Sequence, residues 1–262
     1  MNRLWAWLFG GTESLAVSEA DWRQALSLPL FAGLSIEERE RLRALAESLL
    51  ADKTLSGAGG LEPNGRIGAL IAVQAALPIL NLDLAQYGRW SEIIVYPGEF
   101  VPEREEMDEA GVVHRVRQPL SGEAWEGGPL VLSWGDVEQS GRRDGYNVVI
   151  HEFAHKLDMM NGEVDGLPSL PAEMGRQAWA AAFTAAYADF CRRVDAGEAT
   201  RIDPYASESP AEFFAVLSEY FFEWPEPLHE AYPAVYEQMR RFYRQDTLAR
   251  LKGQAHDLAA PR

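Results

Sequence analysis

His151-Glu152-Phe153-Ala154-His155 is the stretch of this sequence that decides its fold class and its chemistry. Helical residues four apart lie about 40° apart around the axis, so His151 and His155 can direct two imidazoles at one metal ion. Glu152 stands close enough to contact a water bound to that metal. Zinc lowers the pKa of such a water to about 7, and a carboxylate can then accept its proton. The motif therefore predicts zinc-assisted attack of water on a carbonyl carbon.

The residues around the motif favour a helix over roughly 146–160. Val148-Val149-Ile150 precede it, Phe153 and Leu157 continue an apolar stripe, and Asn147 can cap the first turn.

A catalytic zinc site needs three protein ligands and an open position for water. The extended motif HExxHxxGxxH is absent, because Asp158 and Asn161 occupy its glycine and third histidine positions. The remaining histidines, His114, His229 and His256, are isolated along the chain. A carboxylate from a second helix is therefore the better candidate for the third ligand.

The segment that begins at Ser209-Pro210-Ala211-Glu212 is the strongest source of that carboxylate. Its pattern is also that of a capping box with proline at the first helical position, so capping alone explains the presence of Glu212. Glu208 in the preceding loop and Glu219 two turns later are rival ligands. Spacing does not decide among the three.

Composition and net charge limit the direct partners and the cellular compartment that we expect for this protein. The chain has 262 residues, 47% of them hydrophobic, and a formal net charge of −16, which argues against nucleic acid or an anionic membrane as a direct partner. The single cysteine, Cys191, excludes an intrachain disulfide and fits a reducing compartment. The apolar run from Ile67 to Leu82 is short and contains a proline, so it predicts a buried helix. We expect a cytoplasmic protein.

The pattern of elements changes along the chain. Residues 12–88 look helical, with a capping box at Ser35 to Glu38 and a helix start at Asn64. Three short β-branched or aromatic segments follow and predict a small sheet: 93–96, 112–116 and 130–134. The acidic stretch 103–109 is expected to be a solvated turn between strands. Further helices are predicted over 172–195, 210–223 and 232–245.

This order of strands, motif helix and carboxylate-bearing helix matches the zincin metallopeptidases. We therefore predict an α+β, zincin-like fold with a small mixed sheet and mainly helical surroundings. Its parts are a helical N-terminal region, 1–88, packed on the core, a catalytic domain, 89–250, and a loose tail, 251–262. The segment Leu130 to Trp134 is either the edge strand that pairs with substrate or an internal strand.

The sequence resembles the Mlc titration factor A family of bacterial metallopeptidases. The likeness rests on HEFAHKLD from His151, on Pro210-Ala211-Glu212-Phe213-Phe214 and the residues that follow, and on Ile202-Asp203-Pro204-Tyr205. That family is distantly similar to the catalytic domain of anthrax lethal factor. By this resemblance one zinc ion per chain is bound by His151, His155 and Glu212, Glu152 is the general base, and Tyr205 donates to the oxyanion.

The resemblance further implies aminopeptidase-like activity on peptides and binding of a transcriptional repressor of the Mlc type. Repressor sequestration could equally be the main role, with hydrolysis secondary. Glu99, Glu138 and Glu208 are candidates for holding a substrate's amino terminus. Asp158, nearly two turns after His151, could orient a ligand imidazole or pair with an arginine.

Overall fold

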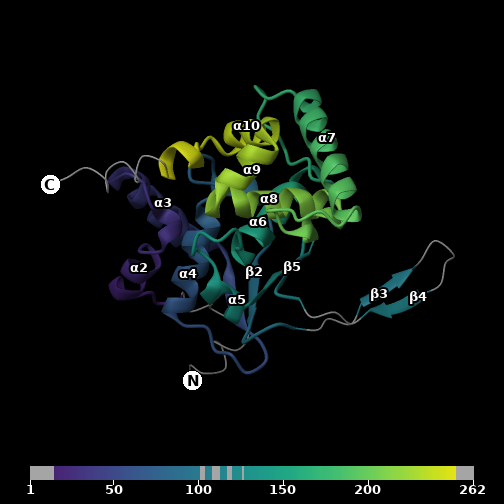
Figure 1. Cartoon of the computed structure of the whole chain (residues 1–262). Coiled ribbons are helices and arrows are strands. Elements are labelled where there is room, and N and C mark those ends of the chain that lie inside the picture. The colour runs from purple at the N-terminus through teal and green to yellow at the C-terminus, as the bar shows by residue number, and fades with distance from the viewer. Residues whose placement is uncertain (1–14, 101–103, 108–112, 117–119, 126, 252–262) are drawn as a thin grey trace, which may run out of the picture.

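The structure, a computed structural model, describes residues 15–100, 104–107, 113–116, 120–125 and 127–251. The N-terminal half contains α2 (Glu19–Ala25), η1 (Pro29–Phe31), α3 (Ile36–Asp52), β1 (Thr54–Gly57), α4 (Gly65–Ala76), η2 (Leu84–Tyr87) and β2 (Glu92–Tyr96). The middle contains β3 (Arg104–Met107), β4 (Val113–Val116), β5 (Gly122–Ala124), β6 (Leu130–Ser133) and α5 (Trp134–Gln139). The rest is α6 (Val148–Asp158), η3 (Met159–Asn161), α7 (Arg176–Asp195), η4 (Pro204–Ser207), α8 (Pro210–Glu223), α9 (Pro225–Ala231) and α10 (Pro233–Tyr243). The predicted α+β class, a small mixed sheet among many helices, is confirmed (Figure 1).

The sheet has the strand order β1-β2-β6-β5. Strands β1, β2 and β6 run parallel, and β5 is antiparallel to β6. Of the two alternatives for residues 130–134, the edge strand is wrong and the internal strand is confirmed: β6 lies between β2 and β5, and Trp134 begins α5. All four residues of β6 are buried, as expected for a strand covered on both faces. The edge beside α6 is the three-residue strand β5.

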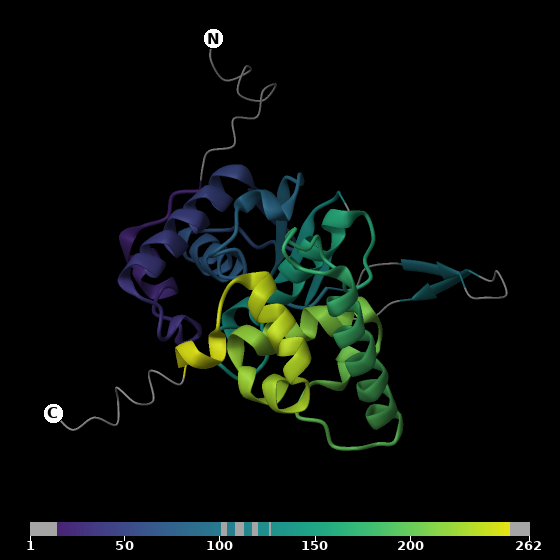
Figure 2. The same cartoon turned by 90° about the horizontal axis from the view of Figure 1, so that it is seen from above.

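A two-stranded ribbon stands away from the rest of the fold in both views (Figures 1 and 2). It pairs β3 with β4 in antiparallel register, Glu105 opposite Arg115. Residues 104–107 are thus a strand, whereas the sequence predicted a turn. A ribbon that does not pack on the main sheet needs no apolar alternation, so the acidic segment gave no strand signal. The predicted strand 112–116 is β4, and residue 112 lies outside the described residues.

Helix starts follow their capping residues. Ser35 and Glu38 form the predicted capping box of α3, and Asn64 caps α4 by accepting from Ile67 N. The predicted buried helix is confirmed, because every residue of α4 from Ile67 to Ala76 is buried. None of the described helices has the length and apolar character required to cross a membrane.

The core centres on α8, which is buried along almost its whole length. Its aromatic residues pack against α7 and α10, for example in the contacts of Phe213 with Phe190 and of Phe214 with Phe242. On its other side α8 packs along α6, the helix of the HExxH motif (Figure 1). The site is built between these two helices. The division into N-terminal region, catalytic domain and loose tail stays a prediction, and residues 252–262 lie outside the described part.

Candidate metal centre

Helix α6 presents the two histidines of the motif on one face. Asn147 caps it, with its side-chain oxygen accepting from Ile150 N at 3.0 Å. His151 and His155, one turn apart, bring their Nε2 atoms to 3.2 Å from each other. Local helix geometry therefore supplies two converging nitrogen donors.

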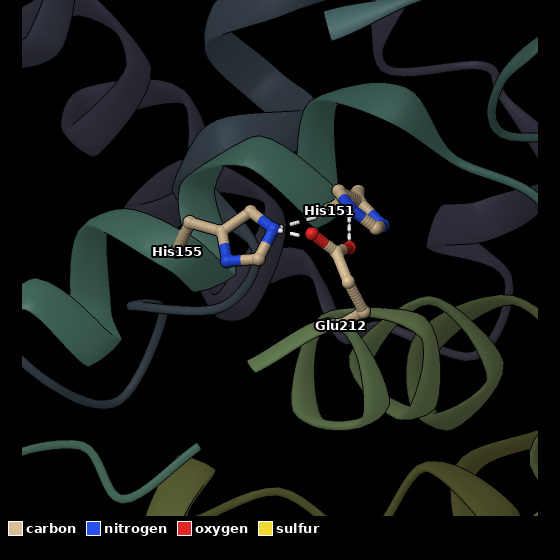
Figure 3. Close-up of side chains that lie close together, drawn as sticks. All are labelled: His151, His155 and Glu212. Carbon is tan, nitrogen blue, oxygen red and sulfur yellow. Dashed lines mark hydrogen bonds and ion pairs between the residues drawn. The ribbon is translucent and has the colours of Figure 1, made fainter. Parts of the chain in front are cut away.

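Helix α8 supplies the third donor. Ser209 Oγ accepts from Glu212 N at 3.1 Å, which caps the helix through the backbone of Glu212. The Glu212 carboxylate turns toward α6 instead: Oε2 lies 3.0 Å from Nε2 of His151 and 3.4 Å from Nε2 of His155 (Figure 3). Of the three rival carboxylates, Glu212 is the one that joins both histidines.

The three donor atoms fit a tetrahedral metal ion. They are the only group of three or more His, Cys, Asp or Glu donors within the described residues that could hold a metal, with the ligand atoms within 4.8 Å of one another. Zinc bonds of about 2.0–2.1 Å at tetrahedral angles put neighbouring donors about 3.3 Å apart. The observed separations of 3.0, 3.2 and 3.4 Å agree with that spacing. Two imidazoles and one carboxylate also form a donor set that suits zinc.

Glu219 orients one of the ligands. Its Oε1 lies 2.8 Å from Nδ1 of His151, and its Oε2 accepts from the backbone N of Asn147. A proton on Nδ1 that points at a carboxylate leaves Nε2 unprotonated and turned toward the metal position. The sequence offered Glu219 only as a rival ligand. Its spacing of seven residues, two helical turns from Glu212, was the signal that placed it on the same face.

Asp158 has neither of the two roles predicted for it. Its carboxylate is buried and accepts from Gly166 N at 2.8 Å, and within the described residues it bonds no ligand imidazole and no arginine. Asp158 therefore holds the loop after α6 in place.

Neighbouring carboxylates raise the pKa of His151. Burial lowers its pKa, but the hydrogen bonds with Glu212 and Glu219 outweigh burial and hold the pKa well above its usual value. Protons and a metal therefore compete for the Nε2 atom of His151.

Glu152, between the two histidines in sequence, lies against Gly122 of β5. It is 5% exposed, and its Oε2 has no hydrogen-bond partner within the described residues. Burial raises the pKa of its carboxyl. A buried carboxylate beside a metal position is more basic than one in water, which is a property that a general base requires.

Tyr205 lies in η4, at the exposed side of the site. Its side chain is 48% exposed, and its ring centroid lies 6.1 Å from that of His151. Asp203 caps the turn by accepting from Tyr205 N at 2.9 Å. The structure thus brings Tyr205 next to the predicted metal ligands, in a short helical turn directly before α8.

A pocket of about 450 Å³ opens beside His151 and Glu152. Its walls come from the start of β5, the loop 144–146, η4 and α8. None of Glu99, Glu138 and Glu208, the acidic residues predicted to hold an amino terminus, lines it. Glu138 instead forms an ion pair with Arg66. The acidic residues of this pocket outside α6 and α8 are Asp144 and Asp203, which sequence reasoning missed because neither lies in a periodic element.

The loop before α6 is held by a third carboxylate of α8, that of Glu223. Glu223 is fully buried, and its Oε1 accepts from Gly141 N at 2.8 Å and from Asn147 Nδ2 at 2.6 Å. Its Oε2 accepts from Arg143 N at 2.6 Å. The three carboxylates of α8 therefore have different positions in the site. Glu212 is a candidate ligand, Glu219 contacts His151, and Glu223 holds the loop that borders the pocket.

The fold and the His-His-Glu cluster define a zincin-like metallopeptidase. Comparison with known families agrees, because the model of the glucose-regulated metallo-peptidase M90 family matches residues 12–244. The chain belongs to this family. Similar relatives include proteins called Mlc titration factor A from Pectobacterium atrosepticum and Yersinia enterocolitica, 40% and 41% identical over 249 residues. These alignments cover 94% of this chain and 94% and 93% of the respective relatives.

Proposed function

We propose that the protein is a zinc-dependent, aminopeptidase-like peptidase of the cytoplasm. The observation that supports this most is the convergence of His151, His155 and Glu212 beside the buried carboxylate of Glu152, at the end of a pocket. When bound, zinc would supply a Lewis acid that lowers the pKa of a water and polarises the substrate carbonyl. The other parts of the reaction are properties of this chain's own residues.

Glu152 is the proton carrier of the proposed reaction. It accepts a proton from the attacking water and delivers it to the leaving amine. Its burial supports this role, because a carboxylate whose pKa is raised accepts a proton more readily than one in water.

Tyr205 is the proposed donor to the oxyanion that develops on the substrate carbonyl. Its place beside His151 supports this role, and removal of one such donor typically costs about 10²–10³ in rate.

Strand β5 is the proposed backbone partner of the substrate. Among the described strands it is an edge strand, paired with β6 on one side only, and its residue Gly122 lines the pocket. An extended peptide laid antiparallel or parallel to such an edge gains main-chain hydrogen bonds in register with the pocket.

Replacement of the base tests the mechanism. Glu152→Gln should retain zinc and lose peptide hydrolysis by about 10²–10⁴-fold, whereas Glu163→Gln, an exposed control, should leave both unchanged. Zinc content and hydrolysis of free aminoacyl and internally quenched peptides are the two measurements. Full activity of Glu152→Gln would reject this mechanism.

A second candidate function is binding of a transcriptional repressor of the Mlc type. Relatives with about 40% identity carry the name Mlc titration factor A, and a net charge of −16 suits a basic, DNA-binding partner. Glu152→Gln should still recover the repressor in a pull-down, because charge complementarity does not need the base. Loss of capture only in that variant would tie binding to hydrolysis.

A further inference from the structure

The pocket beside the metal centre has two aspartates in its wall. Asp144 and Asp203 both line it, and no lysine or arginine does so among its described lining residues. A volume of about 450 Å³ lies within the range of about 300–1,000 Å³ usual for small-ligand sites. The wall thus offers negative charge to a ligand small enough to reach the metal centre.

Tyr220 of α8 brings the two acidic segments together. Its hydroxyl donates to the carbonyl oxygen of Arg201 at 2.9 Å, two residues before Asp203. On the other side, the loop of Asp144 packs against the same ring, where a Cβ on Gly145 would lie 2.9 Å from Cε1. Burial, with the negative charges of Asp203 and other nearby carboxylates including Asp144, raises the pKa of Tyr220 to about 12. The two aspartates therefore flank one tyrosine ring.

The orientation of both carboxylates is set by their own backbone. Oδ1 of Asp203 accepts from Tyr205 N at 2.9 Å, and Oδ1 of Asp144 accepts from Tyr146 N at 3.2 Å. Neither Oδ2 has a hydrogen bond or an ion pair with another described residue. Each aspartate thus has one oxygen bound in a local turn and one left for a ligand.

An independent observation also points to a ligand in this pocket. Glu152, which also lines it, is 5% exposed and has an Oε2 atom without a hydrogen-bond partner within the described residues. A buried polar atom without a partner calls for one supplied from outside the chain. A second metal ion is not favoured, since no cluster of donors that includes Asp144 or Asp203 is dense enough to hold one in the described part.

We infer that Asp144 and Asp203 bind the free α-ammonium group of the substrate's first residue. This assignment rests on the proposed peptidase function and gives it a structural basis for cleavage at the amino terminus. The α-ammonium lies two covalent bonds from the carbonyl carbon of the first residue, so it must enter the same pocket when that carbonyl reaches the metal centre. Carboxylates and electron-rich tyrosine rings are the groups that bind a primary ammonium.

The assignment is tested by substitutions that remove the negative charge of the two aspartates but keep the backbone turns that they stabilise. Asp144→Asn and Asp203→Asn, singly and together, keep an Oδ1 that accepts from the backbone but lose the negative charge. Asp165→Asn is the matched control, because Asp165 is exposed, accepts from Leu167 N at 3.0 Å in the same way, and does not line this pocket. Substrates are an alanyl peptide with a free amino terminus and its N-acetylated form.

The double variant should lower kcat/KM for the free peptide by about 10–100-fold, the loss expected for a charged hydrogen bond. The slow cleavage of the acetylated peptide and the zinc content should not change, and Asp165→Asn should behave as wild type. The assignment is overturned if wild type cleaves both peptides equally, or if the double variant retains its preference for the free peptide.

A lysine side chain also carries a primary ammonium, so a third peptide with lysine before the cleaved bond and an acetylated amino terminus separates the two sources. If the double variant loses activity on that peptide alone, the pocket binds ε-ammonium and the assignment is wrong.

Binding of unreacted alanylalanine amide to Glu152→Gln, measured by calorimetry, separates failure of the assignment from failure of the proposed function. If no variant hydrolyses peptides, weaker binding after Asp144→Asn and Asp203→Asn still supports the ammonium site. Unchanged binding rejects it.

Discussion

Gly122 of β5 lies directly against the carboxylate of Glu152: a Cβ at this position would overlap Oε1 and lie 2.6 Å from Cγ. Real Cβ atoms do not approach so closely, so even a methyl group must displace the side chain of Glu152. The carboxylate of Glu152, the proposed base, therefore occupies the space that a side chain at position 122 of the edge strand would need.

Gly122→Ala should lower kcat by about 10–100-fold, since a base displaced by about 1 Å loses alignment with its proton. Zinc content should stay at the wild-type level, because no ligand is contacted. Gly98→Ala is the control, as a Cβ at Gly98 meets nothing within 4 Å. Steady-state kinetics with metal analysis make the measurement, and wild-type kcat in Gly122→Ala would show that Glu152 is not held by β5.

The backbone N of Glu212 donates to the capping Ser209, whereas its carboxylate faces the histidines, so capping and metal binding can be separated. Glu212→Gln should keep the cap but lose zinc, because an amide is a poor zinc ligand. Ser209→Ala should do the reverse, lowering the free energy of unfolding by about 1 kcal/mol while zinc stays bound. Zinc stoichiometry and denaturant unfolding of the metal-free forms distinguish them, and unchanged zinc in Glu212→Gln would remove Glu212 from the ligand set.

Glu219→Ala should weaken zinc binding by about 10–100-fold, the usual effect of losing a carboxylate that orients a histidine ligand. The Nδ1 of His151 would lose its acceptor, and so would the backbone N of Asn147. Competition with a chromophoric chelator gives the dissociation constant. Glu208→Ala, an exposed neighbour, serves as control, and equal affinity in both variants would contradict the orienting role.

Asp158 predicts a pH dependence of stability. Burial raises its pKa from 3.8 to about 6 in the folded chain. The folded state therefore keeps a proton that the unfolded chain releases, so this group lowers stability as pH rises from about 4 to about 6. Asp158→Asn retains an acceptor for Gly166 and should remove that loss, making the variant more stable than wild type at pH 7 by up to about 2–3 kcal/mol.

Denaturant unfolding at pH 4 and pH 7, with chelator present so that no cation contributes, tests this prediction. The difference between Asp158→Asn and wild type should vanish near pH 4. A variant that is less stable than wild type at pH 7 would mean that the carboxylate is ionised and stabilising.

The sequence predicted those features of the fold and site that depend on local geometry. The convergence of His151 and His155 follows from helical spacing, and the starts of α3, α4 and α6 follow from Ser35, Asn64 and Asn147. Comparison with a known family was needed to select Glu212 among three carboxylates, because spacing along one helix does not say which residue faces another helix.

Features that depend on tertiary pairing were missed. Strand β5 is three residues long and begins with glycine, so its position at the edge is visible only once β6 is paired on both sides. The contact of Glu219 with His151 needs α6 and α8 to pack in one particular register. Asp144 and Asp203 lie in loops, where no periodicity links them to a pocket.

The positions of the acidic residues along α8 require a fixed number of residues between them. Glu212, Glu219 and Glu223 stand seven and four residues apart, so all three project from one side. Removal or insertion of a single residue between Glu212 and Glu219 would turn the later two by about 100° relative to the first. Such a change replaces none of the three glutamates, but it would separate the metal position from the loop that borders the pocket. Homologous chains should therefore keep the number of residues between Glu212 and Glu223 unchanged.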